Sequence, residues 1–272
     1  MEQLQGTVAI ITGAASGIGR STAISLARAG VSIIAADIDE AGAAKVAAKI
    51  NSTDGAAFGV RCDVATVDAF EKLKDVVFDR FGRIDIVMNN VGVLTSGRPD
   101  ELPVTEWERI FQVNLLSVIR SNAVFLPLLI AKGSGHIVNT SSFAGLLTYA
   151  FDRLPYAAAK AAIVQISEGL ALYLRPQGIG VTCLCPGPVK TNIMSTTRIF
   201  SSDLDVRGPG PQFDLIEPDS VGDMVVDAIR TNKFMLFTHP QVRDLLIERA
   251  TDFDAFLQKQ IDAPHIIIKR SS

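Results

Sequence analysis

The stretch Thr12-Gly13-Ala14-Ala15-Ser16-Gly17-Ile18-Gly19 follows a short apolar run at 8–11 and leads directly into a segment of helical periodicity at 18–29. This order predicts a strand, a glycine-rich turn and a helix in immediate succession. In such a turn the backbone N–H groups and the positive end of the helix dipole face the same point. We therefore expect a phosphate group to bind there.

The spacing of the glycines separates this turn from two common phosphate-binding motifs. The glycines stand at 13, 17 and 19, which is not the usual G-x-G-x-x-G pattern. The turn also lacks the lysine of a P-loop, because Gly19 is followed by Arg20. A plain tight turn without a ligand is the alternative interpretation of the glycines taken alone.

Short runs rich in Val and Ile alternate with longer segments of helical periodicity along the chain. The short runs are apolar throughout, which indicates strands buried on both faces and hence a parallel sheet with helices on each side. The expected strands are 8–11, 31–36, 57–60, 84–89, 136–139, 181–184 and 234–237. The expected helices are 18–29, 40–50, 67–81, 105–130, 156–174, 220–231 and 241–259. The pattern predicts a single α/β domain with a doubly wound parallel sheet.

The composition indicates a globular protein with a packed core, because 48% of the 272 residues are hydrophobic and 20% are charged. This length fits one large α/β domain. The net charge is −3 and the basic residues are not clustered, which argues against nucleic acid or an anionic membrane as a partner.

The segment 118–131 is the longest strongly apolar stretch, but polar residues and a proline interrupt it. A bilayer span needs about 20 consecutive apolar residues, so we expect no membrane partner. Residues 1–6 do not resemble a signal peptide, and we expect a cytoplasmic protein. Three cysteines in that compartment are expected to be buried thiols, with no disulfide framework and no metal site. They are Cys62, Cys183 and Cys185.

The second expected strand ends at Asp37, 18 residues after Gly19, the last glycine of the turn. A carboxylate at that place can accept hydrogen bonds from the ribose hydroxyls of an adenosine. A 2′-phosphate would face Asp37 without a basic partner, because Ile38 follows it and Ser16 occupies the turn. We therefore expect NAD rather than NADP. The alternative role of Asp37 is a helix cap, although Asp39 could cap instead.

Polar residues also follow the third and fourth expected strands. Asp63 and Val64 follow the third strand, where they would lie beside an adenine. Asn89 and Asn90 end the fourth strand, and a tie between loops is the alternative role of these two asparagines.

The pentapeptide Tyr156-Ala157-Ala158-Ala159-Lys160 places a phenol and an ammonium on one face of a helix, separated by small residues. A free tyrosine has a pKa of about 10, and a cation within about 4–6 Å can lower the pKa of an acid by about 1–3 units. The pair therefore predicts a general acid/base. Tyr149 and Arg153 repeat the spacing outside a helix start, and we expect Tyr149 to be a wall of the substrate pocket.

Together these motifs resemble those of the short-chain dehydrogenase/reductase family, over about residues 5–192. The resemblance implies a Rossmann-like fold and an NAD-dependent oxidoreductase acting on CH–OH donors. It implies that Tyr156 is the acid/base and that Lys160 holds the nicotinamide ribose and lowers the pKa of the tyrosine. It further implies that Ser142 orients the substrate oxygen and that Asn114 holds a proton-relay water. Pro186-Gly187 also stands in the family's order.

The resemblance also implies a set of nucleotide contacts and an assembly into a homotetramer or homodimer. The nucleotide-binding residues are Gly13, Ser16, Gly17, Ile18, Gly19, Asp37, Asp63, Val64, Asn90, Tyr156, Lys160, Val189 and Thr191. Of these, Val189 and Thr191 are expected to meet the nicotinamide carboxamide.

Three features depart from the family pattern. Val91 replaces a small alanine after the paired asparagines, and the separation of Ser142 and Tyr156 is about one residue longer than usual. The glycine-rich tail of the family is missing. The segment 237–240 and a charged helix at 241–259 stand in its place, an ending similar to that of some bacterial dehydrogenases of bulky or aryl-bearing alcohols.

The residues expected around the substrate are mostly apolar, which predicts a hydrophobic secondary alcohol or its ketone. They are Leu94, Phe143, Leu146, Leu147, Tyr149, Leu154, Met194, Ile199 and Phe200. Packing under a loop or at a subunit interface is the alternative role of several of them. Arg98 and Arg153 could instead bind an acidic substituent.

The expected organisation places dinucleotide binding in 1–92 and catalysis in 93–192. A substrate lid would follow at 193–218, and a helix-strand-helix ending at 219–272. Two other functions compete with the dehydrogenase. A methyltransferase that uses S-adenosylmethionine shares the glycine turn and the acid but has no need of Ser142, Tyr156 and Lys160. A non-catalytic nicotinamide-nucleotide sensor would usually have lost the tyrosine or the lysine.

Overall fold

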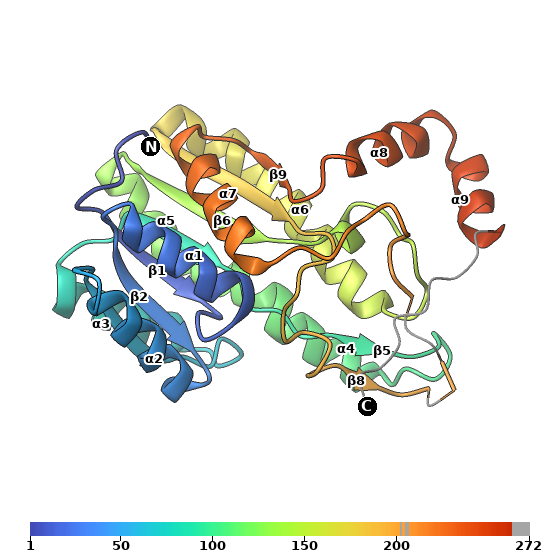
Figure 1. Ribbon diagram of the computed structural model, residues 1–272, viewed down its shortest axis with the longest axis horizontal. Coiled ribbons are helices and arrows are strands. Elements are labelled where there is room, and N and C mark those ends of the chain that lie inside the picture. Colours follow the sequence, from blue (N-terminus) through green and yellow to red (C-terminus); the bar gives the residue numbers. More distant parts are fainter. Residues whose placement is uncertain (202, 205–206, 263–272) are drawn as a thin grey trace.

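The computed structural model describes residues 1–201, 203–204 and 207–262. A sheet forms the centre of the fold, with helices packed around it (Figure 1). The order of its strands is β3-β2-β1-β4-β6-β7-β9, and every pair of neighbours is parallel. The strands are β1 (Val8–Thr12), β2 (Ser32–Asp37), β3 (Ala57–Arg61), β4 (Ile86–Asn89), β6 (Gly135–Thr140), β7 (Ile179–Cys185) and β9 (Met235–Phe237). All seven strands expected from the sequence are present, within two residues of their expected bounds.

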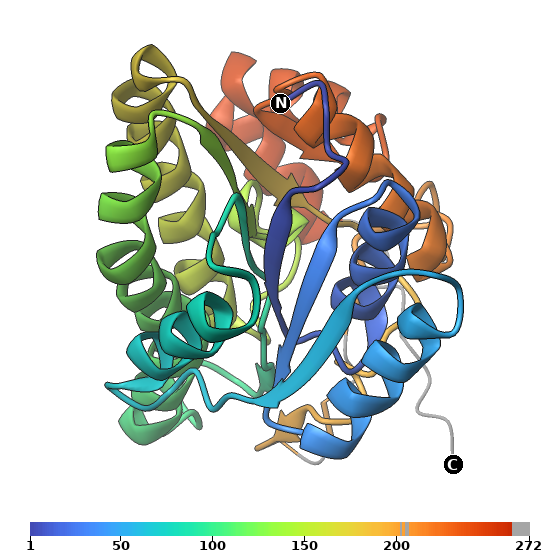
Figure 2. The same cartoon turned by 90° about the vertical axis from the view of Figure 1, so that its left-hand side faces the viewer.

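Helices cover both faces of this sheet (Figure 2). The helices of one face are α1 (Gly17–Arg28), α2 (Glu40–Asn51) and α7 (Pro218–Arg230), and those of the other are α3 (Ala69–Phe81), α5 (Ser117–Lys132) and α6 (Leu154–Leu174). Each face has its own hydrophobic core. Leu26 and Val225 belong to the first core, and Phe70 and Phe125 belong to the second. The doubly wound α/β fold is confirmed.

The sheet explains the continuous apolar runs of the sequence. Along β2, Ile33 and Ala35 point into one core while Ile34 and Ala36 point into the other, and all four are fully buried. Burying a side chain such as isoleucine contributes about 1.5–3 kcal/mol to stability. Both faces of each central strand therefore select apolar residues, and no alternation is left in the sequence.

The helix expected at 105–130 consists of three parts. It begins as α4 (Val104–Ile110), continues as one π-helical segment, η1 (Phe111–Leu116), and ends as α5. The hydroxyl of Ser117, the first residue of α5, donates to the carbonyl oxygen of Val113 in the π-helical segment over 2.6 Å. Single π turns of this kind are common at functional sites, and this one contains Asn114.

The helix expected at 241–259 is two helices, α8 (Val242–Thr251) and α9 (Phe253–Asp262). The backbone of Asp252 is extended, and its carboxylate accepts the N–H of Ala255 over 2.9 Å. Asp252 therefore ends one helix and caps the next. The two helices extend away from the sheet beyond β9 (Figure 1).

The segment 193–218 lies beside the residues that follow β4. Its short strand β8 (Arg198–Ile199) pairs in parallel with β5 (Thr95–Ser96). The sequence analysis did not predict this pair, because two residues are too few to show a periodic pattern. The pair joins the expected lid to the expected catalytic region.

Two helical stretches, Val104–Lys132 and Leu154–Gln177, are long and apolar enough to cross a membrane by length and composition alone. The expectation that no stretch reaches this size is wrong for these two. Both stretches include a helix that packs on the sheet, where Leu129 and Leu174 are fully buried. Their apolar character thus has a structural cause inside the fold.

The three cysteines are buried and free, as expected. Cys183 and Cys185 lie on the same side of β7 with their Sγ atoms 3.8 Å apart. Burial raises the pKa of the Cys62 thiol to about 11, which makes this thiol a weak nucleophile.

His136 predicts a specific acid sensitivity of the fold. It is fully buried on β6, its Nε2 lies 2.8 Å from the Thr182 hydroxyl, and burial lowers its pKa to about 3. The unfolded chain binds a proton at His136 below about pH 6.5, whereas the folded chain does so only near pH 3, so stability falls as the pH drops through this window. Relative to His136→Asn, the wild-type free energy of unfolding should decrease by up to about 1.4 kcal/mol per pH unit.

Urea unfolding at several pH values between 4 and 8 measures this difference. The gap between the two proteins should be constant above pH 7 and change below it. Parallel curves over the whole range would show that His136 does not titrate as described.

Candidate active site

The glycine turn adopts a backbone that only glycine accommodates easily. Gly13 and Gly17 have φ values of +68° and +53°. A Cβ atom on Gly19 would collide with the carbonyl oxygen of Gly13 and the side chain of Asn90. Ser16 precedes α1 in an extended conformation, and its side chain makes no capping hydrogen bond, so it does not occupy the first N–H groups of the helix. The donors of the turn fit an anionic group.

Hydrogen bonds join the carboxyl ends of β1, β4 and β6 beside this turn. The backbone N–H of Asn90 donates to the Thr12 hydroxyl over 3.0 Å, and its side-chain amide donates to the Thr12 carbonyl over 3.2 Å. The Thr140 hydroxyl in turn donates to the Asn90 side-chain oxygen over 3.3 Å. Asn90 therefore ties the strand ends together, while Ile18 anchors α1 in the core.

The carboxylate of Asp37 lies against the glycine turn. It accepts the N–H of Ala15 over 2.9 Å and the N–H of Asp39 over 3.0 Å. Asp39 caps α2 by accepting the N–H of Gly42, so the alternative role of Asp37 as that helix cap is wrong. Asp37 instead connects the end of β2 to the turn.

The expectation that Asp37 has no basic neighbour needs correction. Arg61 on β3 is the register partner of Asp37 on β2, and its side chain is exposed. Sequence reasoning considered only the residues next to Asp37 and those of the turn, whereas the parallel register brings a third segment to the same edge.

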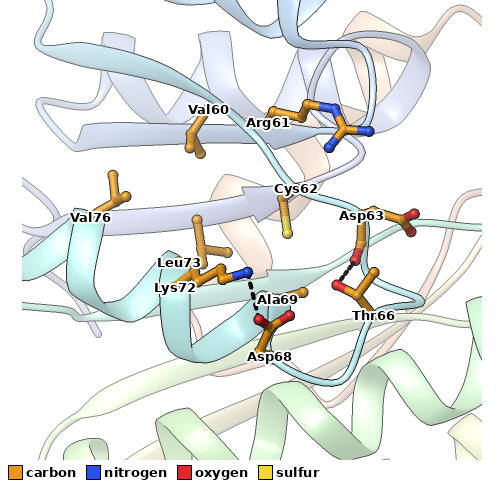
Figure 3. A pocket seen from close by; sticks show the side chains of 10 residues that line it. All are labelled: Val60, Arg61, Cys62, Asp63, Thr66, Asp68, Ala69, Lys72, Leu73 and Val76. Carbon is orange, nitrogen blue, oxygen red and sulfur yellow. Dashed lines mark hydrogen bonds and ion pairs between the residues drawn. The ribbon is translucent and has the colours of Figure 1, made fainter.

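Asp63 follows β3 and lines a cavity of about 330 Å³ between β3 and α3 (Figure 3), whereas the next residue, Val64, is buried in the core. The backbone of Asp63 accepts the Thr66 hydroxyl, and Lys72 pairs with Asp68 at the rim. The residues that line the cavity are Val60, Arg61, Cys62, Asp63, Thr66, Asp68, Ala69, Lys72, Leu73 and Val76. The role of Asp63 and Val64 beside an adenine stays a prediction.

The segment after β7 returns to the glycine turn. The methyl carbon of Thr191 lies 3.0 Å from the position that a Cβ on Gly17 would occupy. Val189 forms an isolated parallel bridge with Ile216, which fixes the approach of this segment. The structure thus brings Thr191 close to the start of α1, while Val189 packs against the core. The contacts of Val189 and Thr191 with a nicotinamide stay a prediction.

Lys160 is buried on α6, and its Nζ donates to the Thr140 carbonyl oxygen over 2.8 Å. The same nitrogen lies 5.6 Å from the centre of the Tyr156 ring. It is also close to Gly92, because a Cβ atom added to this glycine would lie 3.5 Å from the nitrogen. Burial lowers the pKa of Lys160 to about 8. The Lys160 amine is therefore only partly protonated near this pH, and its positive charge is reduced accordingly.

Tyr156 and Ser142 lie together where β6 and α6 meet. Burial raises the pKa of Tyr156 to about 12, and a hydrogen bond with the Ser142 hydroxyl opposes this shift. Ser142 Oγ also accepts the N–H of Ala144 over 3.2 Å, which orients the side chain. The sequence led us to expect a lowered pKa because of Lys160. In the structure burial dominates, and the cation that opposes it is Arg153.

Asn114 is fully buried in the π-helical segment and holds the backbone that follows β4. Its side-chain oxygen accepts the N–H of Val93 over 2.8 Å, and its side-chain amide donates to the Val93 carbonyl over 2.9 Å. This pair of bonds gives Asn114 a structural role. Its role toward a proton-relay water stays a prediction.

The expected substrate residues fall into different environments. Phe143 is buried with Phe213 and His239, with ring centres 5.2 Å and 5.8 Å away, so it supports the site rather than lining a pocket. Leu146, Leu147 and Leu154 contribute to a surface cavity of about 320 Å³ together with Trp107, Ala144, Gly145, Thr148, Ala157, Ala158, Ala161 and Arg249. Leu94 is buried, whereas Met194, Ile199 and Phe200 are exposed on the segment 193–218.

His239 connects this aromatic cluster to two loops. Its Nε2 donates to the Asp214 carbonyl oxygen over 2.7 Å, and its Nδ1 lies 2.8 Å from the Thr238 hydroxyl. That hydroxyl accepts the N–H of Gly187 over 2.9 Å. The unusual ending of the chain therefore reaches the loops around Ser142.

The two arginines considered for an acidic substituent already have carboxylate partners. Arg98 makes two hydrogen bonds of 2.8 Å to Asp203, and Arg153 pairs with Asp152 over 2.6 Å. Both charges are balanced within the chain, so neither arginine presents an unpaired cation to an acidic substrate.

The arrangement of glycine turn, serine, tyrosine and lysine agrees with comparisons with known proteins. The profile of the family described as short chain dehydrogenase matches residues 7–200. The chain belongs to the short-chain dehydrogenase/reductase family. The matched region is thus that of an oxidoreductase family, which argues against the methyltransferase. A non-catalytic nucleotide sensor would share this fold, and both Tyr156 and Lys160 are present in this chain.

Relatives and solved structures support this assignment. Probable oxidoreductase EphD of Mycobacterium tuberculosis is 36% identical over 237 residues, which are 84% of this chain and 40% of that protein. This chain thus spans less than half the length of EphD. The 1-deoxy-11-beta-hydroxypentalenate dehydrogenase of Streptomyces exfoliatus is 32% identical over 252 residues, 92% of this chain and 89% of that protein.

A short-chain dehydrogenase/reductase from Burkholderia phymatum, crystallised in complex with NAD, has a similar fold. The TM-score is 0.84 at 30% identity, with 97% of this chain and 99% of that chain covered. The short-chain dehydrogenase fold therefore extends beyond the region that the family profile matches.

Gly19→Ala should abolish nucleotide binding, because the added methyl group collides with the Gly13 carbonyl. Gly169→Ala is the matched control. Gly169 lies within α6, and a Cβ atom there meets nothing within 4 Å, so this change should preserve binding and stabilise the helix by roughly 0.5–1 kcal/mol.

Titration of NADH fluorescence with each purified variant, beside thermal unfolding, measures both effects. Equal affinity of a folded Gly19→Ala variant and the wild type would show that the turn does not contact the nucleotide.

Proposed function

We propose that this short-chain dehydrogenase/reductase interconverts a hydrophobic secondary alcohol and its ketone with NAD(H), using Tyr156 as the general acid/base. The observation that carries the proposal is the meeting of Ser142, Tyr156 and Lys160 at the carboxyl edge of the sheet, beside the glycine turn. Ligands of open α/β sheets bind at this edge.

The proposed roles follow from the position of each group. The glycine turn and the start of α1 would hold the pyrophosphate, Asp37 the adenosine ribose and Lys160 the nicotinamide ribose. The nicotinamide, when bound, accepts or supplies the hydride. Ser142 donates a hydrogen bond to the substrate oxygen. Tyr156 removes the hydroxyl proton during oxidation and returns it during reduction.

The pKa of Tyr156 sets the direction of the pH dependence. Only a small fraction of a phenol with a pKa of about 12 is ionised at neutral pH, so the oxidation rate should rise with pH over the range 7–10. Ketone reduction uses the protonated phenol and should not rise with pH.

The preference for NAD is part of the proposal. Asp37 presents a carboxylate at the end of β2, where a 2′-phosphate would meet like charge. The solved relative from Burkholderia phymatum is a complex with NAD. Arg61 stands opposite Asp37 and is the residue that would moderate the preference.

Asp37→Asn tests this preference. Removing the negative charge should improve binding of NADPH relative to NADH by at least tenfold, which corresponds to about 1.4 kcal/mol. Asp39→Asn is the control, because the Asp39 carboxylate caps α2 by accepting the N–H of Gly42, whereas the Asp37 carboxylate accepts the N–H of Ala15 in the turn. Fluorescence titrations with both nucleotides give the ratio. An unchanged ratio in Asp37→Asn would remove Asp37 from cofactor selection.

A hydrophobic substrate is supported by the apolar side chains that follow Ser142 in the chain, among them Leu147 and Tyr149. One relative is named as a dehydrogenase of a hydroxylated pentalenate. In this chain Arg98 and Arg153, the two arginines considered for an acidic substituent, are paired with carboxylates.

We also propose that 193–218 acts as the substrate lid, supported by the pairing of β8 with β5. A cytoplasmic location and a homotetramer or homodimer complete the proposal.

Tyr156→Phe should lower turnover by a factor of about 10² to 10⁴ with little change in NADH affinity, because only the proton-transfer group is removed. A panel of aryl, alicyclic and polyol secondary alcohols with NAD⁺ measures this, with NADH formation as the readout. Tyr173→Phe, an exposed tyrosine on the same helix, is the control and should retain full activity.

The panel also tests the substrate class. Activity confined to polyols would overturn the hydrophobic substrate, and near wild-type turnover of Tyr156→Phe would overturn the mechanism.

A further inference from the structure

A chain of hydrogen bonds runs through Thr238 and His239, two buried residues that directly follow β9. Nε2 of His239 donates to the Asp214 carbonyl oxygen over 2.7 Å, because a carbonyl can only accept. In the neutral imidazole Nδ1 then accepts the hydroxyl proton of Thr238 over 2.8 Å. The Thr238 oxygen in turn accepts the backbone N–H of Gly187 over 2.9 Å. The tail of the chain thus links Gly187 to Asp214.

Gly187 is also held by direct packing. A Cβ atom added to this glycine would lie 2.6 Å from Nδ1 of His239 and 2.6 Å from Cε2 of Phe143. The backbone N–H of Phe143 donates to the Pro186 carbonyl oxygen over 2.9 Å. Because Phe143 directly follows Ser142, the backbone at 186–187 lies against the loop that carries this serine.

The segment 186–191 connects the two halves of the proposed site. Its start is tied to Phe143, beside Ser142, and at its end the Thr191 methyl carbon lies 3.0 Å from the Cβ position of Gly17 at the start of α1. Under the proposed function, the phosphates lie at the glycine turn and the nicotinamide lies at Tyr156. The nucleotide must therefore run beside the segment 186–191.

The stretch that supports this segment is held by the same histidine. The N–H of Ile216 donates to the Pro188 carbonyl over 3.2 Å, and the N–H of Lys190 donates to the Ile216 carbonyl over 2.9 Å. Asp214, two residues before Ile216, accepts the Nε2 proton of His239. Thr238 and His239 therefore fix both the start of 186–191 and the stretch that pairs with it.

We propose that Thr238 and His239 are positioning residues that set the segment 186–191, and with it the nicotinamide half of the bound nucleotide, against Ser142. This inference rests on the proposed function. Hydrogen bonds from Asn90 to Thr12 hold the glycine turn independently of the tail. The effect is therefore confined to the nicotinamide half, and the adenosine half is bound as before.

Thr238→Val tests the proposal, because it removes the hydroxyl with little change of shape and leaves the Gly187 N–H without its acceptor. Affinity for NADH should fall about tenfold, whereas affinity for ADP-ribose, which lacks the nicotinamide, should stay within about twofold of the wild type. Thr238→Ser keeps the oxygen and should restore the affinity for NADH. Fluorescence titration of NADH and calorimetry of ADP-ribose measure both without turnover.

Kinetics give a second readout. In Thr238→Val kcat should fall about tenfold even at saturating NAD⁺, because saturation does not restore the alignment of a displaced ring. His239→Phe keeps an aromatic ring beside Phe143 and Phe213 but loses both hydrogen bonds of the imidazole. It should shift the ratio of the two affinities in the same direction, and it serves if Thr238→Val does not fold.

Thr182→Val is the matched control. Thr182 is buried within β7, where its hydroxyl donates to the Lys233 carbonyl over 2.7 Å and lies 2.8 Å from Nε2 of His136. It thus belongs to a similar pair of threonine and histidine, but its hydrogen bonds go to β6 and to Lys233 rather than to 186–191. This variant should lose thermal stability and keep the wild-type ratio of NADH to ADP-ribose affinity.

An unchanged ratio in folded Thr238→Val, or an equal loss of affinity for both nucleotides, would overturn the proposal, since Thr238 would then only stabilise the fold. Failure of the wild-type protein to bind NADH would instead contradict the proposed function. The two failures therefore give different results.

Discussion

The hydrogen bonds between Thr12, Asn90 and Thr140 are the constraint on which the site depends. They hold the carboxyl ends of β1, β4 and β6 at one level, so that the glycine turn and Lys160 face the same space. Thr140 serves both ends of this arrangement, since its hydroxyl bonds to Asn90 and its carbonyl accepts the lysine amine. A shift of one strand would therefore move the nucleotide site and the acid/base site together.

Burial acts on Tyr156 and Lys160 in opposite directions, and both effects favour the uncharged forms. The pKa of the tyrosine rises to about 12 and that of the lysine falls to about 8. A site that transfers protons near neutral pH needs positive charge to offset this desolvation.

Much of the fold could be predicted from the sequence, because strands buried on both faces leave long apolar runs between helical patterns. The site motifs were equally visible, since Tyr156 and Lys160 are close in the chain and the three glycines of the turn lie between residues 13 and 19. Contacts that join distant segments could not be predicted. The register of Arg61 with Asp37 and the bonds of Asp152 to Arg207 depend on tertiary packing, and the interruption at Asp252 depends on one local cap.

The cluster of Phe143, Phe213 and His239 gives the chain ending a part in shaping the substrate side. His239 follows β9, while Phe143 is the next residue after Ser142, so the two ends of this contact come from the tail and the catalytic loop. The nucleotide half of the molecule takes no part in it. Under the proposed function, a substitution at Phe213 or His239 would therefore change the surroundings of Ser142 while leaving the glycine turn unaltered.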